Sequence, residues 1–131
     1  MSAKKNKEVV RRFFDEVCNG GLDEKVYDIF ADKVSFNGKQ GSPEGVIRFL
    51  KRIRMSFALL RVEVKEQIAE RDIVSTRRVW TGTPRKRSHP SFGKLITWNE
   101  ISIVRLVDNK IVEDWKEESK RVRVIRIARK K

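Results

Sequence analysis

The sequence predicts an α+β fold, in which helices and antiparallel strands occupy separate parts of the chain. Two observations carry this prediction. Apolar residues recur mainly at helical spacing before residue 57, and with a period of two from Leu60 onward. The second pattern is repeated in four successive runs, as expected of a meander of strands. Segregation of this kind is typical of the α+β class.

The chain length indicates one domain. A chain of 131 residues can close one hydrophobic core. We expect a single domain over residues 1–131, with a core of about 6–120 and a basic tail of 121–131. No apolar run approaches the length of a membrane span, and the N-terminus MSAKKNKEVV lacks a signal-peptide apolar region. We therefore expect a cytoplasmic protein without a membrane partner.

Three helices are expected before the meander. Residues 7–18 carry an apolar stripe at helical spacing, which Asn19-Gly20-Gly21 should end because glycine accepts the left-handed cap conformation. Asp23 is the expected N-cap of a short second helix that runs to Phe30. Ser42 should cap the third helix, since Pro43 suits the first helical position and a stripe reaching toward Phe57 follows.

The strands follow from alternation. A brief strand is expected at residues 34–37, and the meander consists of residues 60–70, 73–83 and the hairpin 96–115. Asp108-Asn109 tolerates positive φ and suits the hairpin turn. One face of the hairpin's first strand carries the alternate residues Ile96, Trp98, Glu100, Ser102, Val104 and Leu106. Both faces mix apolar and polar residues, so we expect cover or a cavity on each.

The net charge of +13 favours anionic partners: nucleic acid, an anionic lipid surface or an acidic small molecule, although it could serve solubility alone. The basic loop 85–87 and the tail 121–131 are candidates for polyanion binding. No aromatic residue interleaves with these charges, and no nucleic-acid-binding signature is present, so a solvated basic face is favoured. With one cysteine, Cys18, and one histidine, we expect no internal disulfide, His/Cys metal site or cofactor.

Four segments, taken in order, resemble the SnoaL-like polyketide cyclases of the nuclear transport factor 2-like superfamily: VVRRFFDEVCNGGLDE, SPEGVIRFLKRIRMSF, LRVEVKEQIAERDIV and VDNKIVEDW. The likeness runs from about Asn6 to about Lys116. It implies one SnoaL-like domain, a cone-shaped cystatin-like roll whose strongly curved antiparallel sheet wraps around the three helices, with a pocket in its wide end. The superfamily includes cyclases, isomerases, epoxide hydrolases and binding proteins, so the fold leaves the activity open.

The resemblance also points to positions in the pocket. In these cyclases an aspartate follows the Trp of the last strand and acts as general base, and Lys116 stands there in this chain. Pocket histidines of the family correspond to Asn37, Ser102 and Asp114. Proton abstraction needs a positioned base, and an ammonium serves only if burial lowers its pKa. Whether the chain is an enzyme is therefore left open by the sequence.

The leading hypothesis is a small-molecule pocket protein that binds or transforms a compact, partly apolar and anionic ligand. Asp114 is the candidate base, Glu100 its partner acid, and Arg78 or Lys116 the anchor for an anion. The other expected ligand-binding residues are Asn37, Trp80, Trp98 and Ser102. Alternatively, the four charges form salt bridges that only satisfy a partly buried sheet face, and the tryptophans are core aromatics.

A second hypothesis is a non-enzymatic adaptor or assembly domain. The opposite sheet face would gather Val79, Ile101, Ile103 and Trp115 into an apolar patch, which a homodimer through the sheet would cover. We also expect residues 122–127 to pair with the sheet or with a second subunit, because an unpaired apolar strand invites aggregation.

Overall fold

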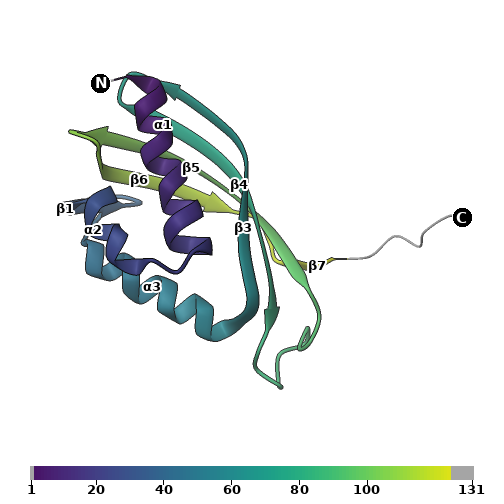
Figure 1. The fold of residues 1–131 in the computed structure, drawn as a ribbon. Coiled ribbons are helices and arrows are strands. Elements are labelled where there is room, and N and C mark those ends of the chain that lie inside the picture. The colour runs from purple at the N-terminus through teal and green to yellow at the C-terminus, as the bar shows by residue number, and fades with distance from the viewer. Residues whose placement is uncertain (1, 125–131) are drawn as a thin grey trace, which may run out of the picture.

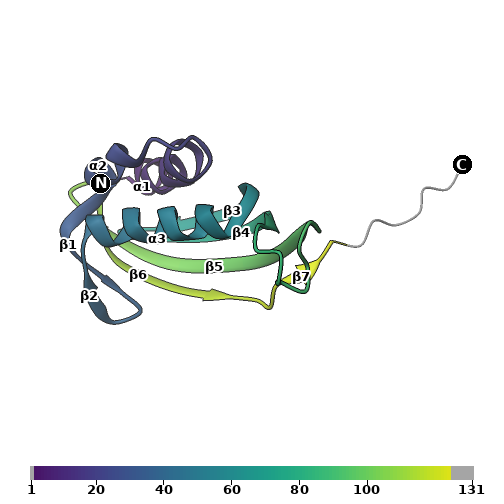
Figure 2. The same cartoon turned by 90° about the horizontal axis from the view of Figure 1, so that it is seen from below.

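The computed structural model describes residues 2–124. Helices α1 (Ala3–Arg12), α2 (Val26–Ile29) and α3 (Pro43–Ser56) lie on one face of a curved sheet (Figures 1 and 2). The strands are β1 (Phe30–Phe36), β2 (Lys39–Gly41), β3 (Phe57–Glu70), β4 (Ile73–Pro84), β5 (Ile96–Val107), β6 (Lys110–Glu118) and β7 (Val122–Arg123). The α+β class and the curved sheet expected from the sequence are confirmed. None of the described helices is long and apolar enough to cross a membrane.

The sheet is mixed rather than wholly antiparallel, which corrects the prediction. Its order is β2-β1-β6-β5-β4-β3, and β7 pairs with β5. Strand β1 runs parallel to β6, with Ser35 opposite Glu113. The expected meander of β3 to β6 is antiparallel throughout. Short turns force neighbouring strands to be antiparallel, but β1 and β6 are distant in sequence, so their relative direction has no local signal.

The first helix is longer than predicted. It begins at Ala3, where the Ser2 side chain accepts a hydrogen bond from the backbone N–H of Lys5. After Arg12 it continues as a π-helical segment, η1 (Phe13–Asn19). The side chain of Asn19 then joins this segment to β3: its Nδ2 donates to the Val62 carbonyl at 2.8 Å, and its Oδ1 accepts from the Val62 N–H at 2.9 Å.

Asp23 does not cap the second helix as predicted. Leu22 occupies the cap position of a short 3-10 turn, η2 (Asp23–Lys25), that leads into α2. The Asp23 carboxylate instead accepts two hydrogen bonds from Arg54, both 2.9 Å long. A charge-assisted bidentate pair outweighs a capping bond, since it is both stronger and geometrically more specific. Phe30, expected in the helix, is the first residue of β1.

The third helix begins as predicted. The Ser42 side chain accepts a hydrogen bond from the Gly45 N–H, and Pro43 is the first helical residue. The helix ends at Ser56, so the buried Phe57 opens β3 and does not extend the helical stripe. Phe57 packs against Trp98, with ring centroids 5.2 Å apart.

The predicted hairpin is confirmed. Asp108 and Asn109 have φ of 51° and 66° and form its turn. The six alternate residues of β5 from Ile96 to Leu106 are all buried beneath the helices. The opposite face is open in the described chain, because Ile101 is 47% and Ile103 is 52% exposed. The expected cover on this second face is therefore not supplied by residues 2–124.

The start of the tail joins the sheet, as predicted. Val122 pairs with Thr97 and Arg123 with Ile96, which continues the edge of β5 beyond the end of β6. Just before this pair, the guanidinium carbon of Arg121 lies 4.5 Å from the centre of the Trp98 ring. The remainder of the predicted strand, up to residue 127, extends outside the described residues.

Candidate ligand-binding site

A cavity of about 380 Å³ lies between the helices and the concave face of the sheet. This volume falls within the range of small-molecule sites in proteins. The wall is mostly apolar, with side chains such as Val10, Phe13, Phe30, Leu50 and Ile111. Five polar side chains from β4, β5 and β6 interrupt it: Arg78, Glu100, Ser102, Asp114 and Lys116. The sequence analysis had placed all five in the pocket.

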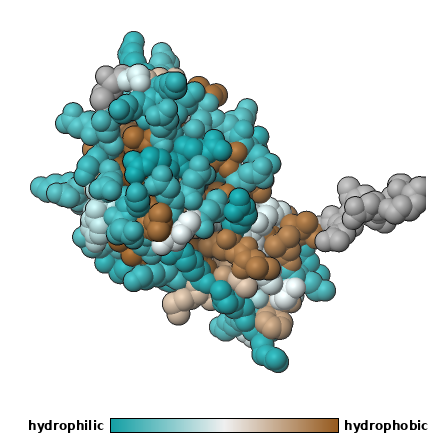
Figure 3. Space-filling model, viewed as in Figure 1, coloured by the Kyte–Doolittle hydropathy of each residue, from teal (hydrophilic) through white to brown (hydrophobic). Residues whose placement is uncertain are grey.

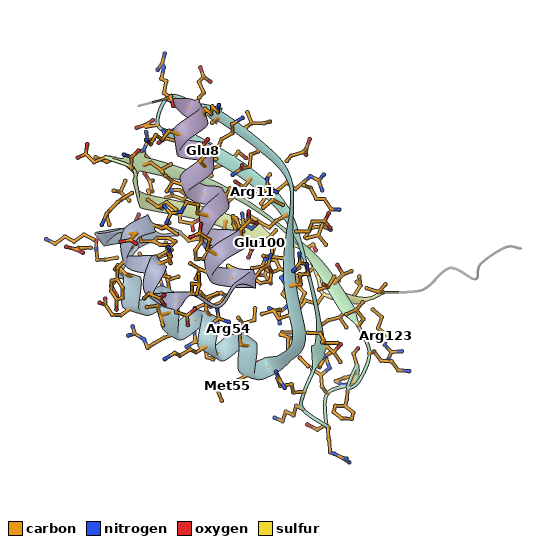
Figure 4. The ribbon with its side chains drawn as sticks, viewed as in Figure 1. Glu8, Arg11, Arg54, Met55, Glu100 and Arg123 are labelled. Carbon is orange, nitrogen blue, oxygen red and sulfur yellow. The ribbon has the colours of Figure 1, made fainter. Side chains whose placement is uncertain are left out.

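Strand register explains why these five residues meet. Arg78 lies directly opposite Glu100 across β4 and β5, and Ser102 lies opposite Lys116 across β5 and β6. Asp114 is two residues before Lys116 on the same strand. Alternate residues of a strand share a face, so all of them point toward the helices. Figure 4 shows Glu100 in the middle of the molecule, near the C-terminal part of the first helix.

Arg78 is largely engaged by protein partners. Its Nε and Nη2 lie 2.9 and 2.8 Å from Oε1 of Glu100, and its Nη1 donates to the Thr76 carbonyl and to the Ser102 hydroxyl. The guanidinium carbon also lies 4.6 Å from the centre of the Phe14 ring. With its charge balanced by Glu100 and most of its donors engaged, Arg78 is a poor anchor for an anionic ligand.

Glu100 organises the polar cluster. Its Oε1 also accepts a hydrogen bond, 2.8 Å long, from Nε1 of Trp80. Its Oε2 faces Lys116, whose Nζ lies 3.9 Å away. Both Arg78 and Glu100 are almost fully buried. The salt-bridge alternative considered from the sequence therefore describes the pair of Arg78 and Glu100 well, and leaves Asp114 and Lys116 as the reactive candidates.

Asp114 carries an unsatisfied oxygen. Its Oδ1 is buried and has no hydrogen-bond partner within residues 2–124. Burial raises the pKa of the Asp114 carboxyl, and Glu100 adds to this, while the positive charges of Lys116 and Arg78 act in the opposite direction. A desolvated carboxyl with a raised pKa, beside a cavity, is the environment in which proteins place groups that exchange protons.

The cations nearest the opening are Lys116 and Arg48. The Nζ of Lys116 lies 4.8 Å from the centre of the Phe49 ring, and a third of its side chain is exposed. Arg48 lines the cavity from the exposed side of α3 and forms no ion pair with any described residue. These two side chains, rather than Arg78, present available positive charge to the cavity.

Two predicted ligand residues lie elsewhere. Asn37 is exposed and structural: its Oδ1 accepts the backbone N–H of Lys116 at 2.8 Å, and it does not line the cavity. Trp98 is buried behind Trp80, whose ring stacks on it at 6.0 Å and an interplanar angle of 4°. Trp80 itself reaches the cavity wall.

Several wall residues were not found from the sequence. Phe14 and Cys18 reach the cavity from η1, and Arg48 and Phe49 reach it from α3. Burial raises the pKa of the Cys18 thiol, so it forms a neutral part of the wall. The Ser42 cap and the apolar stripe after it were the available signal for α3. Residues 2–124 contain no cluster of His, Cys, Asp or Glu that could hold a metal ion.

The fold and the cavity define a class of protein: a small α+β cone, with helices covering the concave face of a curved sheet and a cavity between them. Within this class, the chain belongs to the SnoaL-like polyketide cyclase family, since the profile of that family matches residues 8–120. The resemblance noted in the sequence is thereby confirmed. No curated protein matches the chain.

Solved structures agree with this assignment. A SnoaL-like polyketide cyclase from Agrobacterium tumefaciens superposes with a TM-score of 0.79 at 18% identity, covering 92% of this chain and 94% of its own. IdmH from Streptomyces antibioticus gives 0.78 at 19% identity, covering 86% and 91%. A provisionally assigned polyketide cyclase from Acidithiobacillus ferrooxidans gives 0.78 at 24% identity, covering 92% of both chains. At these identities the likeness shows the fold alone.

Proposed function

We propose that this chain binds a compact, partly apolar ligand in the cavity and that Asp114 exchanges a proton with it. The observation that carries the proposal is the buried, unpaired Oδ1 of Asp114 at the cavity wall. Leaving a buried polar atom without a partner is unfavourable. A ligand that supplies the missing hydrogen bond would remove this penalty, so the free protein is prepared for such a ligand.

The position of Asp114 fits a general base. In the family the base follows the Trp of the last strand, where this chain has Lys116. Positions 114 and 116 share the inner face of β6, about 7 Å apart along the strand at the usual rise per residue. A carboxylate at position 114, where the family often has a histidine, would keep a base in the cavity but move it along the wall.

The names of the related proteins suggest a carbonyl-rich substrate, and the site suits such a molecule. The ionised Asp114 would remove a proton from a carbon beside a carbonyl group. The ammonium of Lys116 would stabilise the enolate oxygen that forms, because charge stabilisation is strong in a site with few waters. The enolate carbon could then attack a second carbonyl carbon and close a ring, with Asp114 returning the proton to the new alkoxide.

Hydrogen–deuterium exchange at carbon tests this step without knowledge of the natural substrate. The probe is a simple cyclic ketone, whose uncatalysed exchange in neutral D₂O is slow, followed by NMR. Asp114→Asn should reduce the catalysed exchange by at least about a hundredfold, as expected when a general base is lost. Asp32→Asn, an exposed site on β1, is the matched control and should exchange like the wild type.

Binding and chemistry can be tested separately. If Asp114→Asn and the wild type exchange equally, Asp114 is not the base, and a wild type without activity above buffer would leave only the binding part of the proposal. That part has its own test, which is native mass spectrometry of the purified protein with a series of apolar carboxylates. Lys116→Met should lower their affinity, and unchanged affinity would remove Lys116 as the anchor.

A second candidate function, a homodimeric assembly domain, is favoured by the open outer face. Ile101, Ile103 and Trp115 are each about half exposed on the adjacent strands β5 and β6. A shallow hollow lies among them. Apolar groups clustered in this way mark interaction sites, and a two-fold pair through the sheet would cover both copies. Such a dimer is compatible with an active cavity.

A further inference from the structure

One end of the described molecule is strongly basic, although Arg54 and Arg121 there pair with Asp23 and Glu118. We define this basic pole as residues 51–61, 82–97 and 119–124, which contain eleven Lys and Arg and no Asp or Glu. The structure joins the three segments. The Arg85 N–H donates to the Ser56 carbonyl at 3.0 Å, and the Val124 N–H donates to the Leu95 carbonyl at 2.9 Å. Figure 4 shows Met55 and Arg123 at this end, with Glu8 at the other.

The basic pole also exposes apolar side chains. Met55 is 76% exposed and Leu59 is 81% exposed, at the corner where α3 meets β3. The other exposed members are Phe92, Leu95, Val122 and Val124. Figure 3 shows apolar atoms gathered beside β7 among hydrophilic ones. These side chains lie at the corner of α3 and β3, in the loop before β5 and around β7, whereas the patch of Ile101, Ile103 and Trp115 lies on the outer face of the sheet.

Leu59 is held in an unfavourable backbone conformation. Its φ is +55°, in the left-handed region that residues other than glycine and asparagine rarely adopt. It lies where the pairing of β3 with β4 is interrupted between Ala58 and Arg61. The irregularity leaves the Leu59 side chain projecting into water. Strain retained at an exposed apolar residue suggests a function rather than packing.

We propose that the basic pole docks on an anionic lipid surface, with Leu59 and Phe92 entering the headgroup layer. Phosphate or carboxylate headgroups match its positive charge, and the acyl chains beneath them accept its apolar side chains. A nucleic acid would match only the charge, because it needs stacking aromatics on a groove or sheet, and Phe92 is the only exposed aromatic residue of the pole.

This docking is independent of the proposed chemistry in the cavity. None of the residues that line the cavity belongs to the basic pole. The N-terminal half of α3 contributes to the cavity wall, and its C-terminal end contributes to the pole. Loss of membrane binding should therefore leave proton exchange by Asp114 unchanged, and the two proposals can fail separately.

Cosedimentation with vesicles tests the electrostatic part. Vesicles of phosphatidylcholine with about a third phosphatidylserine should bind the protein, and pure phosphatidylcholine should not. Neutralising Lys86, Arg87 and Lys94 together, each to Gln, should lower the partition coefficient about a hundredfold, at about fivefold per residue. The matched control neutralises Lys4, Lys5 and Arg11 on α1 and should bind within about fivefold of the wild type.

A dye at position 59 tests the apolar part. Cys18 is buried, so a second cysteine at the surface can be labelled selectively with a polarity-sensitive dye. Leu59→Cys should give a blue shift on binding to anionic vesicles. Ile68→Cys, 70% exposed near the other end of the same strand, is the matched control and should give none.

Three results would overturn the proposal. The first is equal binding to neutral and anionic vesicles, and the second is anionic binding without a shift at position 59. The third is tighter binding to single-stranded RNA than to anionic vesicles at the same salt concentration. The proposal would be supported by a blue shift at position 59 that is absent at position 68 and is lost when Lys86, Arg87 and Lys94 are neutralised.

Discussion

Arg78 and Glu100 face each other across strands β4 and β5, buried, with Nη2 of the guanidinium 2.8 Å from Oε1 of the carboxylate. This pair fixes the polar end of the cavity, because the same Oε1 also holds the indole N–H of Trp80. It lies beneath helix η1, where the Phe14 ring covers the guanidinium. The pair therefore links the sheet, the helices and the cavity wall.

Glu100→Gln should destabilise the protein strongly. It leaves the Arg78 guanidinium buried without a counter-charge, and breaking one partner of a buried pair typically lowers the free energy of unfolding by about 3–5 kcal/mol. Urea denaturation measures the loss. Glu66→Gln is the matched control, because it breaks the exposed pair with Arg77 at 2.8 Å and should lower it by at most about 1 kcal/mol. Equal losses would contradict the assigned importance of the buried pair.

Asp114 should make stability depend on pH in a definite direction. Burial raises the carboxyl pKa in the native state, so the native protein holds this proton more tightly than the unfolded chain. This tighter proton binding stabilises the native state fully below the unfolded pKa of about 3.9. The stabilisation is lost as the pH rises through the native pKa. Asp114→Asn should remove this loss and be more stable than the wild type at neutral pH. A difference between the two proteins that does not change from pH 4 to pH 8 would contradict the prediction.

The outer face of the sheet should control association. Ile103→Lys places a charge at the centre of the apolar patch and should convert a dimer to a monomer in sedimentation velocity at micromolar concentration. Ile68→Lys adds the same charge at an apolar position that is 70% exposed but lies outside the patch, and it should remain dimeric. A wild-type monomer at this concentration would contradict the assembly hypothesis directly.

Arg121 should stabilise the core that it covers. Its guanidinium carbon lies 4.5 Å from the Trp98 ring centre and 5.4 Å from that of Phe57. Arg121→Ala should lower the free energy of unfolding by about 1 kcal/mol, the scale of a partly exposed cation–π contact, and shift tryptophan emission to the red. Lys120→Ala, its exposed neighbour, should do neither. Identical emission from both variants would show that Arg121 does not shield Trp98.

The sequence predicted the inner face of the sheet because alternation is a local property. Once the phase of β5 is known, Glu100 and Ser102 must point to the same side as Trp98. Alternation does not show where along that face the cavity ends. Trp98 shares the face but lies beyond the cavity, and Asn37 turns away from it at a positive φ of 50°. Both depend on the curvature of the sheet and on how the helices pack.

Only the structure shows which of the positive side chains is available to a ligand. The sequence treated Arg78 and Lys116 as equivalent anchors, but cross-strand register places Glu100 opposite Arg78, where it balances the guanidinium charge. Arg48 was missed because a single arginine on an exposed helix face has no distinguishing pattern. The π-helical widening at Phe13–Asn19, which brings Cys18 to the cavity, likewise follows from tertiary packing rather than from a local motif.

The link between Asn19 and Val62 has a consequence for the chemical lifetime of the protein. Asparagine is thermolabile, and a following glycine, here Gly20, offers little steric hindrance to attack of its backbone nitrogen on the side-chain amide, although in the folded chain that N–H donates to the Val17 carbonyl. Deamidation would replace the Nδ2 donor with an anionic oxygen facing the Val62 carbonyl. The two hydrogen bonds at 2.8 and 2.9 Å hold the amide in place, so ageing at this site should proceed mainly through molecules that have transiently opened there.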